Sequence, residues 1–298
     1  AEMTSYFRWR QAPFAQEQMH AGLLRPDSSE AEAAREVRLA SEAITALGPQ
    51  ETHTAPVALV FSYEAAWVCD IQPQGQSFRY FELVFEWYSA LRQSGLNVDI
   101  VPAGADISGY QAVFVPTLPT AERTFVETLS AFEGPVLLGP RTGSKTVSFQ
   151  IPQGLAPGAI HDLIPIKVTR VESLRPGVKA TGNGFEISRW REDIATELEP
   201  EFALNNGSGV VFRHEHVRYC AAWPDRPLLN MLVQRMAKEA GIALLDLPQG
   251  LRLRQTQSHI FAFNYSTEPV DVEPLGFGLP TLGSSIIGPA GIGVWICE

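Results

Sequence analysis

Short apolar segments alternate with amphipathic ones between residues 57 and 138, and this alternation limits the possible folds more than any other feature of the chain. The apolar runs expected as strands are Val57–Phe61, Val98–Val101, Ala112–Pro116 and Val136–Leu138, and helices are expected around Phe78–Ser94 and Ala121–Phe132. Apolar strands separated by crossover helices are typical of a mostly parallel sheet covered by helices on both faces. The sequence therefore predicts a doubly wound α/β domain.

Two further patterns follow this region. Strands are expected at Phe185–Ile187 and Gly209–Phe212, and apolar residues at helical spacing predict one more helix over Pro227–Gly241. Past Pro248, glycine and proline separate short strands, which are expected at Leu251–Arg254, Ile260–Asn264, Val270–Val272 and Gly293–Ile296. The sequence therefore predicts a small antiparallel β-domain after the α/β domain.

The first twenty residues carry an unusual concentration of aromatic and polar side chains. Ser5 to Trp9 has the residue bias of a short strand, and Pro13 suits the first turn of a helix. Glu17 and His20 lie three residues apart, so they would share one face of that helix. We interpret this stretch as a strand and a loop that present polar side chains.

A helix is expected over Ser29–Leu47, because the apolar residues Ala33, Val37, Ala40 and Ile44 recur there at helical spacing and Gly48-Pro49 is a stop signal. A strand followed by a helix is the unit that closes an α/β barrel. A strand that begins at residue 5 has no earlier element to pair with, and the first residue is not methionine. We therefore expect the chain to be the C-terminal part of a larger protein.

Composition excludes several functions. The 298 residues are 45% hydrophobic, which is enough for a large core and predicts two or more domains. The net charge of −10 opposes the binding of nucleic acid, and no apolar run approaches the ~20 residues that cross a bilayer, so neither partner is expected. Cys69, Cys220 and Cys297 are few and widely spaced, which favours a reduced compartment and a cytoplasmic location.

The segment Gly139–Thr146 superficially resembles a phosphate-binding loop, because it follows an apolar strand and contains glycine, lysine and threonine. It is one residue short between its glycines, and it continues into Val147–Pro152 instead of a helix. Without a helix N-terminus there is no dipole to hold phosphate. A structural loop is the better interpretation, and no nucleotide cofactor is expected.

The sequence His214-Glu215-His216 would place both imidazoles on one face of a strand, where two metal ligands could lie. No third ligand at a suitable spacing is evident, so we expect a solvent-facing pair and no metal site.

Five aromatic residues fall in or near the first helix of the α/β domain. Because apolar residues at helical spacing usually face a core, we assign them to the core or to subunit contacts. They are Trp67, Phe81, Phe85, Trp87 and Tyr88.

Several of these stretches are similar to the pattern of the glycoside hydrolase family 42 β-galactosidases. The similarity covers essentially the whole chain, and its opening motif, Tyr6–His20, is long enough to be specific. It continues in Ser62–Trp67, Gln72–Gly75, Val98–Pro102, Gly139–Thr146, Arg170–Gly177, Pro227–Asn230 and Phe261–Tyr265. The resemblance implies the end of a (β/α)8 barrel in residues 1–48, an α/β trimerisation domain in 49–248 and a small C-terminal β-domain in 249–298.

The resemblance also implies the roles of three residues. Phe7 would line the pocket for the galactose ring, while Glu17 and His20 would hydrogen-bond its hydroxyls. A retaining glycosidase needs two carboxyls ~5 Å apart, and in the family these glutamates lie on earlier barrel strands. We therefore expect no catalytic residue in this chain, no activity from the chain alone, no cofactor, a β-galactoside substrate for the intact protein and a homotrimer.

The α/β domain also resembles the class I glutamine amidotransferase fold, whose nucleophilic cysteine lies on a tight turn after a strand. The comparable turn here is Gly139-Pro140-Arg141, which has no thiol. Cys69 is expected in a loop and Cys220 in a strand, both as inert buried thiols. Amidotransferase activity is therefore not expected.

An alternative of a different class remains open. The chain could be a stand-alone α/β oligomerisation or binding module without catalysis. Phe7, Phe14 and Met19 would then form an exposed apolar patch that a partner could cover.

Overall fold

The computed structural model describes residues 4–297, so residues 1–3 and 298, which include Glu2, lie outside the description. Contacts divide the chain into two units. The first contains residues up to Thr52 together with Thr256–His259 and Cys297, and the second contains the remainder. The domain boundaries expected after residues 48 and 248 stay a prediction.

A seven-stranded, mostly parallel sheet forms the centre of the second unit. Its strand order is β2-β1-β3-β4-β10-β9-β8. The first five strands in this order pair in parallel, and β9 pairs antiparallel with both β10 and β8. The strands are β1 (Val57–Val60), β2 (Val98–Val101), β3 (Ala112–Val115), β4 (Val136–Leu138), β8 (Pro200–Ala203), β9 (Gly209–His214) and β10 (Val217–Cys220). The predicted fold class is confirmed.

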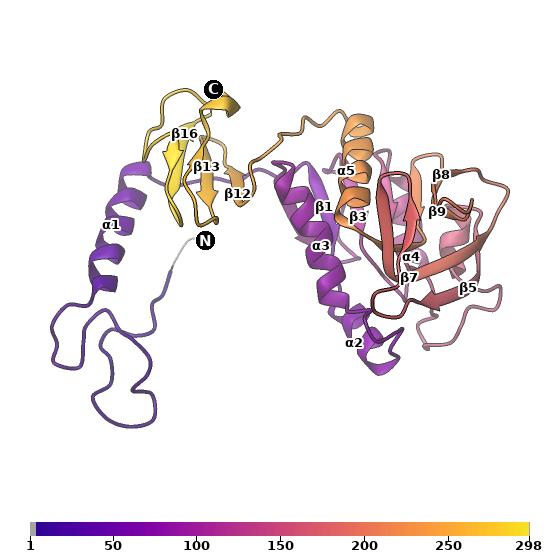
Figure 1. Cartoon of the computed structure of the whole chain (residues 1–298), viewed down its shortest axis with the longest axis horizontal. Coiled ribbons are helices and arrows are strands. Elements are labelled where there is room, and N and C mark those ends of the chain that lie inside the picture. The colour runs from indigo at the N-terminus through magenta and orange to yellow at the C-terminus, as the bar shows by residue number, and fades with distance from the viewer. Residues whose placement is uncertain (1–3, 298) are drawn as a thin grey trace. The chain divides into compact units, whose positions relative to one another are not determined.

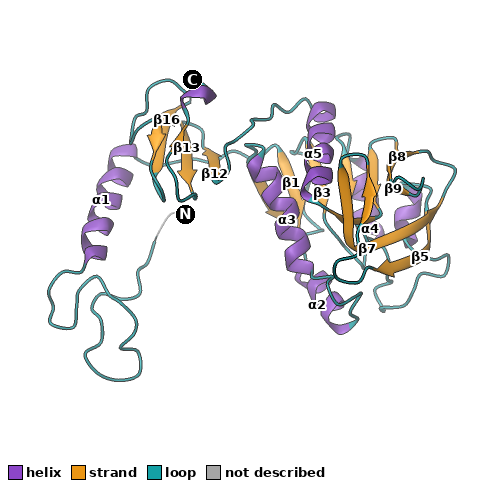
Figure 2. Ribbon diagram, in the orientation of Figure 1, coloured by secondary structure: helices purple, strands orange, loops and turns teal. Residues whose placement is uncertain are grey.

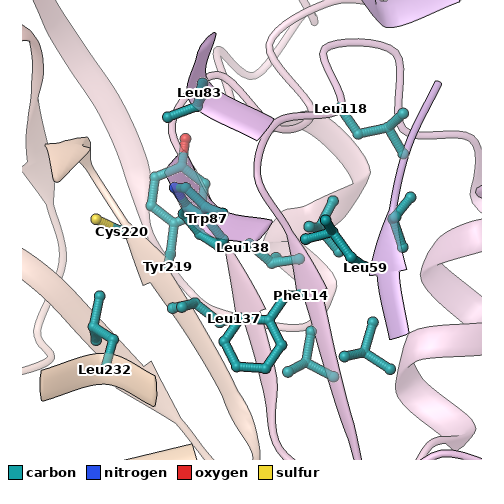
Figure 3. Packing of buried hydrophobic residues seen from close by; sticks show 14 of the residues in the cluster. Leu59, Leu83, Trp87, Phe114, Leu118, Leu137, Leu138, Tyr219, Cys220 and Leu232 are labelled. Carbon is teal, nitrogen blue, oxygen red and sulfur yellow. The ribbon is translucent and has the colours of Figure 1, made fainter. Parts of the chain in front are cut away.

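The central strands are apolar because both of their faces are covered. Every residue of β1, β3 and β4 is buried, as expected for parallel strands between helices. In Figure 3 the side chains of Trp87, Leu138 and Tyr219 lie close together in this core. The uninterrupted apolar runs of the sequence therefore correspond to the central strands of the sheet.

Helices α3 (Tyr80–Gln93) and α5 (Arg226–Ala240) pack against each other beside the sheet (Figure 1). Their buried residues recur at helical spacing, as do those of α4 (Arg123–Ala131). Asp225 caps α5 by accepting a hydrogen bond from the Leu228 N–H at 2.9 Å. These three helices were predicted, whereas α2 (Tyr63–Ile71) was not, and Cys69 therefore lies in a helix and not in a loop.

A second sheet contains strands that the sequence prediction mostly missed. Its order is β11-β7-β5, with β6 also paired to β7. The strands are β5 (Lys167–Ser173), β6 (Ala180–Gly182), β7 (Phe185–Ala195) and β11 (Ala222–Pro224), and a 3-10 helix, η1 (Gly158–Asp162), precedes them. The strand expected at Phe185–Ile187 is the first part of the eleven-residue β7.

Two small antiparallel sheets follow, with their own hydrophobic core around Trp295. One has the order β12-β13-β16, and the other pairs β14 with β15. The elements are β12 (Leu251–Gln255), β13 (His259–Asn264), β14 (Val270–Asp271), η2 (Glu273–Leu275), β15 (Ile286–Ile287) and β16 (Ile292–Ile296). The antiparallel β-region was predicted.

The first unit contains one regular helix, α1 (Glu32–Leu47), within the described residues. Figure 2 draws the segment before it as loop. The segment after α1 is fixed by Gln50, whose side-chain oxygen accepts hydrogen bonds from the Thr256 and Ser258 hydroxyls at 2.9 and 3.3 Å. The N–H of Gln257 also donates to the Glu51 carbonyl at 2.9 Å.

The strand expected at Ser5–Trp9 and the helix expected from Pro13 are wrong. Arg10 makes one isolated bridge to Leu24, and residues 13–20 form turns. Backbone groups of an extended segment need a neighbouring strand, and among the described residues only Leu23 and Leu24 bond to the backbone of residues 8–11.

None of the helices in the described part of the chain combines the length and apolar character that a membrane crossing needs.

Candidate functional site

Backbone hydrogen bonds fix the opening segment as a folded-back loop. The Leu23 and Leu24 N–H groups donate to the carbonyls of Arg8 and Trp9 at 3.1 and 2.8 Å, and the Gln11 N–H donates to Leu24 at 2.9 Å. Gly22 permits this approach, because a Cβ there would lie 2.6 Å from the Gln11 nitrogen. The loop therefore has a defined frame without regular secondary structure.

This frame brings the three predicted site residues together. The Phe7 and His20 rings meet edge to face, with centroids 5.9 Å apart. The Arg8 guanidinium lies 4.8 Å from the centre of the Phe7 ring and forms an ion pair with the Glu17 carboxylate. Sequence analysis missed Arg8, although it belongs to the opening motif, since no spacing rule distinguishes it from Arg10.

The cluster presents its groups to solvent. Phe7 is 69% exposed, and Glu17 and His20 are also exposed. An open aromatic ring beside a carboxylate, an imidazole and a guanidinium offers one apolar surface with several hydrogen-bonding groups, which is the composition of a small-ligand site. Phe14 and Met19 are each exposed as well.

Three carboxylates of this segment have partners within the described residues. Glu17 pairs with Arg8, the Asp27 carboxylate accepts hydrogen bonds from the Ser29 hydroxyl and N–H, and Glu30 pairs with Arg38 at 2.8 Å. The hydrogen bonds from Ser29 hold the pKa of Asp27 below its usual value. Each of these three carboxylates is held by a guanidinium or a hydroxyl of the protein, which suits a group that binds or orients a ligand.

The His214-Glu215-His216 sequence is a turn and not part of one strand, because β9 ends at His214 and β10 begins at Val217. Glu215 has a φ of +50°, and the Nε2 atom of His216 lies 3.0 Å from the Leu129 carbonyl oxygen. Within residues 4–297, no group of three or more His, Cys, Asp and Glu side chains is arranged to hold a metal ion.

The cysteines carry no disulfide in the described part of the chain. Burial raises the pKa of Cys69 and of Cys220 to about 12, so both thiols are protonated at neutral pH. Because the thiolate is the nucleophile, neither is prepared for attack on an amide. The cytoplasmic location inferred from the cysteine pattern stays a prediction.

The turn after β4 carries a buried polar cluster that sequence analysis did not find. Its centre is Glu192, whose side chain has no exposed surface. Tyr219 donates to one carboxylate oxygen at 2.6 Å, while the Arg141 N–H and the Trp190 indole N–H donate to the other at 3.1 and 3.3 Å. Burial raises the pKa of Tyr219, which keeps the phenol protonated as a donor.

Arg141 adds charge to the same cluster. Its guanidinium lies 3.7 Å from the Glu192 carboxylate and donates to the Gln74 side chain at 2.8 Å. The turn that was compared with the amidotransferase turn therefore contains an ion-paired arginine and no thiol. No sequence spacing could indicate this, since Arg141 and Glu192 lie on separate elements.

Comparison with known proteins places the chain among the glycoside hydrolases. Residues 55–243 match the family model described as the β-galactosidase trimerisation domain, and residues 1–47 match the model described as β-galactosidase. The chain belongs to the glycoside hydrolase family 42 β-galactosidases.

Individual relatives agree with this assignment. A β-galactosidase of Thermus thermophilus is 47% identical over 99% of this chain, and the β-galactosidase Bga of Halorubrum lacusprofundi is 30% identical over 90%. The solved β-galactosidase structure from the psychrophilic Marinomonas ef1 superimposes with a TM-score of 0.95 at 38% identity over the whole chain. The chain spans 46%, 42% and 47% of these three proteins, so it represents about half of their length.

Proposed function

We propose that this chain is part of a retaining β-galactosidase that hydrolyses terminal β-D-galactosides, and that its opening loop contributes contacts to the galactose. The observation that carries the proposal is the cluster of Phe7, Arg8, Glu17 and His20 in the segment that matches the β-galactosidase model. Phe7 would cover the apolar face of the sugar, while Glu17 and His20 would bond to its hydroxyls.

In this proposal the loop orients substrate, and cleavage depends on two glutamates outside the chain. Support comes from the carboxylates of Glu17, Asp27 and Glu30, each of which already has a partner in the protein. The charge of Glu17, for example, is offset by Arg8. The intact enzyme would use double displacement with retention at the anomeric carbon. The chain alone would then bind or assemble without hydrolysing a glycoside.

The test is a fusion of this chain to the remaining portion of the Thermus thermophilus relative, assayed with o-nitrophenyl β-galactoside beside the chain alone. We expect turnover only from the fusion. Turnover by the chain alone would contradict the absence of catalytic carboxylates, and an inactive but folded fusion would contradict the proposed role.

Replacing Glu17 by alanine in that fusion should raise KM by roughly 10- to 100-fold, because a charge-assisted bond to a hydroxyl contributes ~1.5–3 kcal/mol. Initial rates against substrate concentration measure this effect. Glu36→Ala is the matched control, since Glu36 is an exposed carboxylate on α1. Equal KM values for the two variants would remove Glu17 from the site.

We also propose that the protein assembles as a homotrimer, and that an aromatic patch on the second unit contributes to the interface. Phe61 contacts both Tyr63 and Phe81, with ring centroids 4.9 and 6.1 Å apart, and Tyr63 contacts Trp67 at 6.4 Å. Tyr63, Trp67 and Phe81 are each more than half exposed. A contiguous exposed aromatic surface is typical of a protein contact.

The double variant Trp67→Glu/Phe81→Glu should therefore shift the chain from trimer to monomer, because two charges would be desolvated in the interface. Sedimentation equilibrium measures the mass. Val178→Glu, at an exposed apolar position on another element, is the control. A trimer that survives the double change would place the interface elsewhere.

A further inference from the structure

The outer face of the β12–β13 pair combines arginines with aromatic rings. Arg252 lies opposite Phe263 across the two strands, and Arg254 lies opposite Phe261. Alternate residues of the strands, such as Leu253, are buried in the small β-core. Because successive side chains of a strand point to opposite faces, the arginines and the rings share the face directed away from this core.

The rings on this face form a row. Phe261 and Phe263 are stacked with centroids 6.3 Å apart and an interplanar angle of 12°, and Phe263 and Tyr265 have the same spacing and an angle of 28°. Tyr265 is 73% exposed. The row is therefore an evenly spaced aromatic surface that extends along β13.

Helix α3 completes a cavity of about 500 Å³ over this face, within the second compact unit. Phe85, which is 66% exposed, lines it together with Ser89. The Arg92 guanidinium also lines it and donates a hydrogen bond to the Leu253 carbonyl, which ties α3 to β12. The volume lies in the range of small-ligand sites, ~300–1,000 Å³.

Three positive charges converge on this cavity without a balancing carboxylate. Arg92, Arg252 and Arg254 all line it, and within the described residues none of them has an acidic oxygen within 4 Å. Burial lowers the pKa of Arg92; Tyr88 offsets part of this decrease, and the charges of Arg254 and Arg252 add to it. In a chain of net charge −10, this unpaired positive group is an attractive site for an anion.

We propose that this Arg–aromatic groove binds a carboxylated oligosaccharide, with its sugar rings against the aromatic row and its carboxylates on the arginines. Guanidinium groups match carboxylates in a bidentate geometry, and rings in a row suit a ligand that repeats. The site lies on different elements from the opening loop and does not depend on the proposed galactose contacts.

The hydrogen-bonding character of the lining favours a saccharide over an acidic peptide. Arginine offers only donors, and acceptors come from hydroxyls such as those of Ser89 and Tyr265. Each residue of a bound peptide would bring a backbone N–H that needs an acceptor, and this lining supplies few. A carboxylated saccharide presents carboxylates, which only accept, and hydroxyls, which accept as well as donate, to the same arginine donors.

Titration calorimetry of the whole chain with trigalacturonate tests the proposal. We expect saturable binding that weakens with added salt, and roughly tenfold or greater weakening in Arg252→Gln/Arg254→Gln, since charge-assisted bonds are lost. Tyr265→Ala should weaken binding about threefold to tenfold through the lost ring contact. Arg175→Gln, at an exposed arginine on another element, should bind as the unaltered chain does.

Two comparison ligands sharpen the result. Galactotriose, which has no carboxylate, should bind at least tenfold more weakly than trigalacturonate. Tetraglutamate should also bind more weakly; equal or tighter binding of tetraglutamate would overturn the saccharide assignment in favour of an acidic protein segment. Absence of trigalacturonate binding, or equal loss in the Arg175→Gln control, would overturn the proposal, whereas β-galactosidase turnover by the fusion would be unaffected.

Discussion

Replacing Glu192 by alanine should destabilise the second unit by about 3–5 kcal/mol, because removal of one partner leaves a buried charge uncompensated. Arg141 would lose the carboxylate 3.7 Å away, and the Tyr219 hydroxyl and Trp190 N–H would lose their acceptor. Unsatisfied buried donors each cost ~1–3 kcal/mol, so the effect comes from the donors that remain. Urea denaturation followed by tryptophan fluorescence measures the change.

Two control variants separate this effect from a general one. Glu192→Gln keeps the shape and one acceptor oxygen, and we expect it to lose less stability than the alanine variant. Glu199 is an exposed residue between β7 and β8. Glu199→Ala should therefore change the free energy of unfolding by no more than about 0.5 kcal/mol. A Glu192→Ala protein as stable as Glu199→Ala would show that the cluster does not stabilise the fold.

Replacing Gly143 by alanine should cost about 2–5 kcal/mol, from left-handed backbone strain and overpacking together. Gly143 has a φ of +72°, and a Cβ there would lie 2.0 Å from the Pro157 carbonyl oxygen. Since the close atom belongs to the backbone, no side-chain rotation can relieve the clash. Denaturant midpoints at constant m-value measure the loss.

Two other glycines divide this effect into its parts. Gly177 has a φ of +82° and open space around its Cβ position, so Gly177→Ala should show backbone strain alone. Gly154 has open space and no positive φ, so Gly154→Ala should be close to neutral. If Gly143→Ala were no worse than Gly177→Ala, the packing against Pro157 would be unimportant.

The glycines of the segment Gly139–Thr146, which resembles a phosphate-binding loop in sequence, have a packing explanation in the structure. Gly143 and Gly139 both lie where a Cβ would meet a backbone carbonyl oxygen, at 2.0 and 1.9 Å. The glycines are thus explained by close packing of the chain. The sequence predicted a loop without regular structure here, but only the fold identifies the carbonyls that require glycine.

Elements with an uninterrupted apolar run or a clear helical period were predicted, whereas helix α2 has neither and was missed. The fully buried β1, β3 and β4 gave uninterrupted apolar runs, and α5 gave helical spacing with a proline in its first turn. Helix α2 buries Ala65, Ala66, Val68 and Cys69 but also exposes apolar residues such as Trp67, so its hydrophobic residues do not mark one face.

The residues of the opening loop could be selected from the family resemblance, whereas those of the Arg–aromatic groove could be found only from the tertiary structure. Phe7, Glu17 and His20 were selected from the family's motif, and the structure brings them together through turns and not through the expected helix. The Arg–aromatic groove joins Arg92 to Arg252, which are far apart in the chain. Only a known fold places such residues in one cavity.

The hydrogen bonds of Gln50 have a consequence for dissecting this protein. The hairpin turn at residues 256–259 donates hydrogen bonds to the Gln50 side chain and to the Glu51 carbonyl. A gene fragment starting at His53 would remove these acceptors while leaving the strands on either side of the turn intact. Linear excision at that point therefore yields a truncated molecule with a frayed turn.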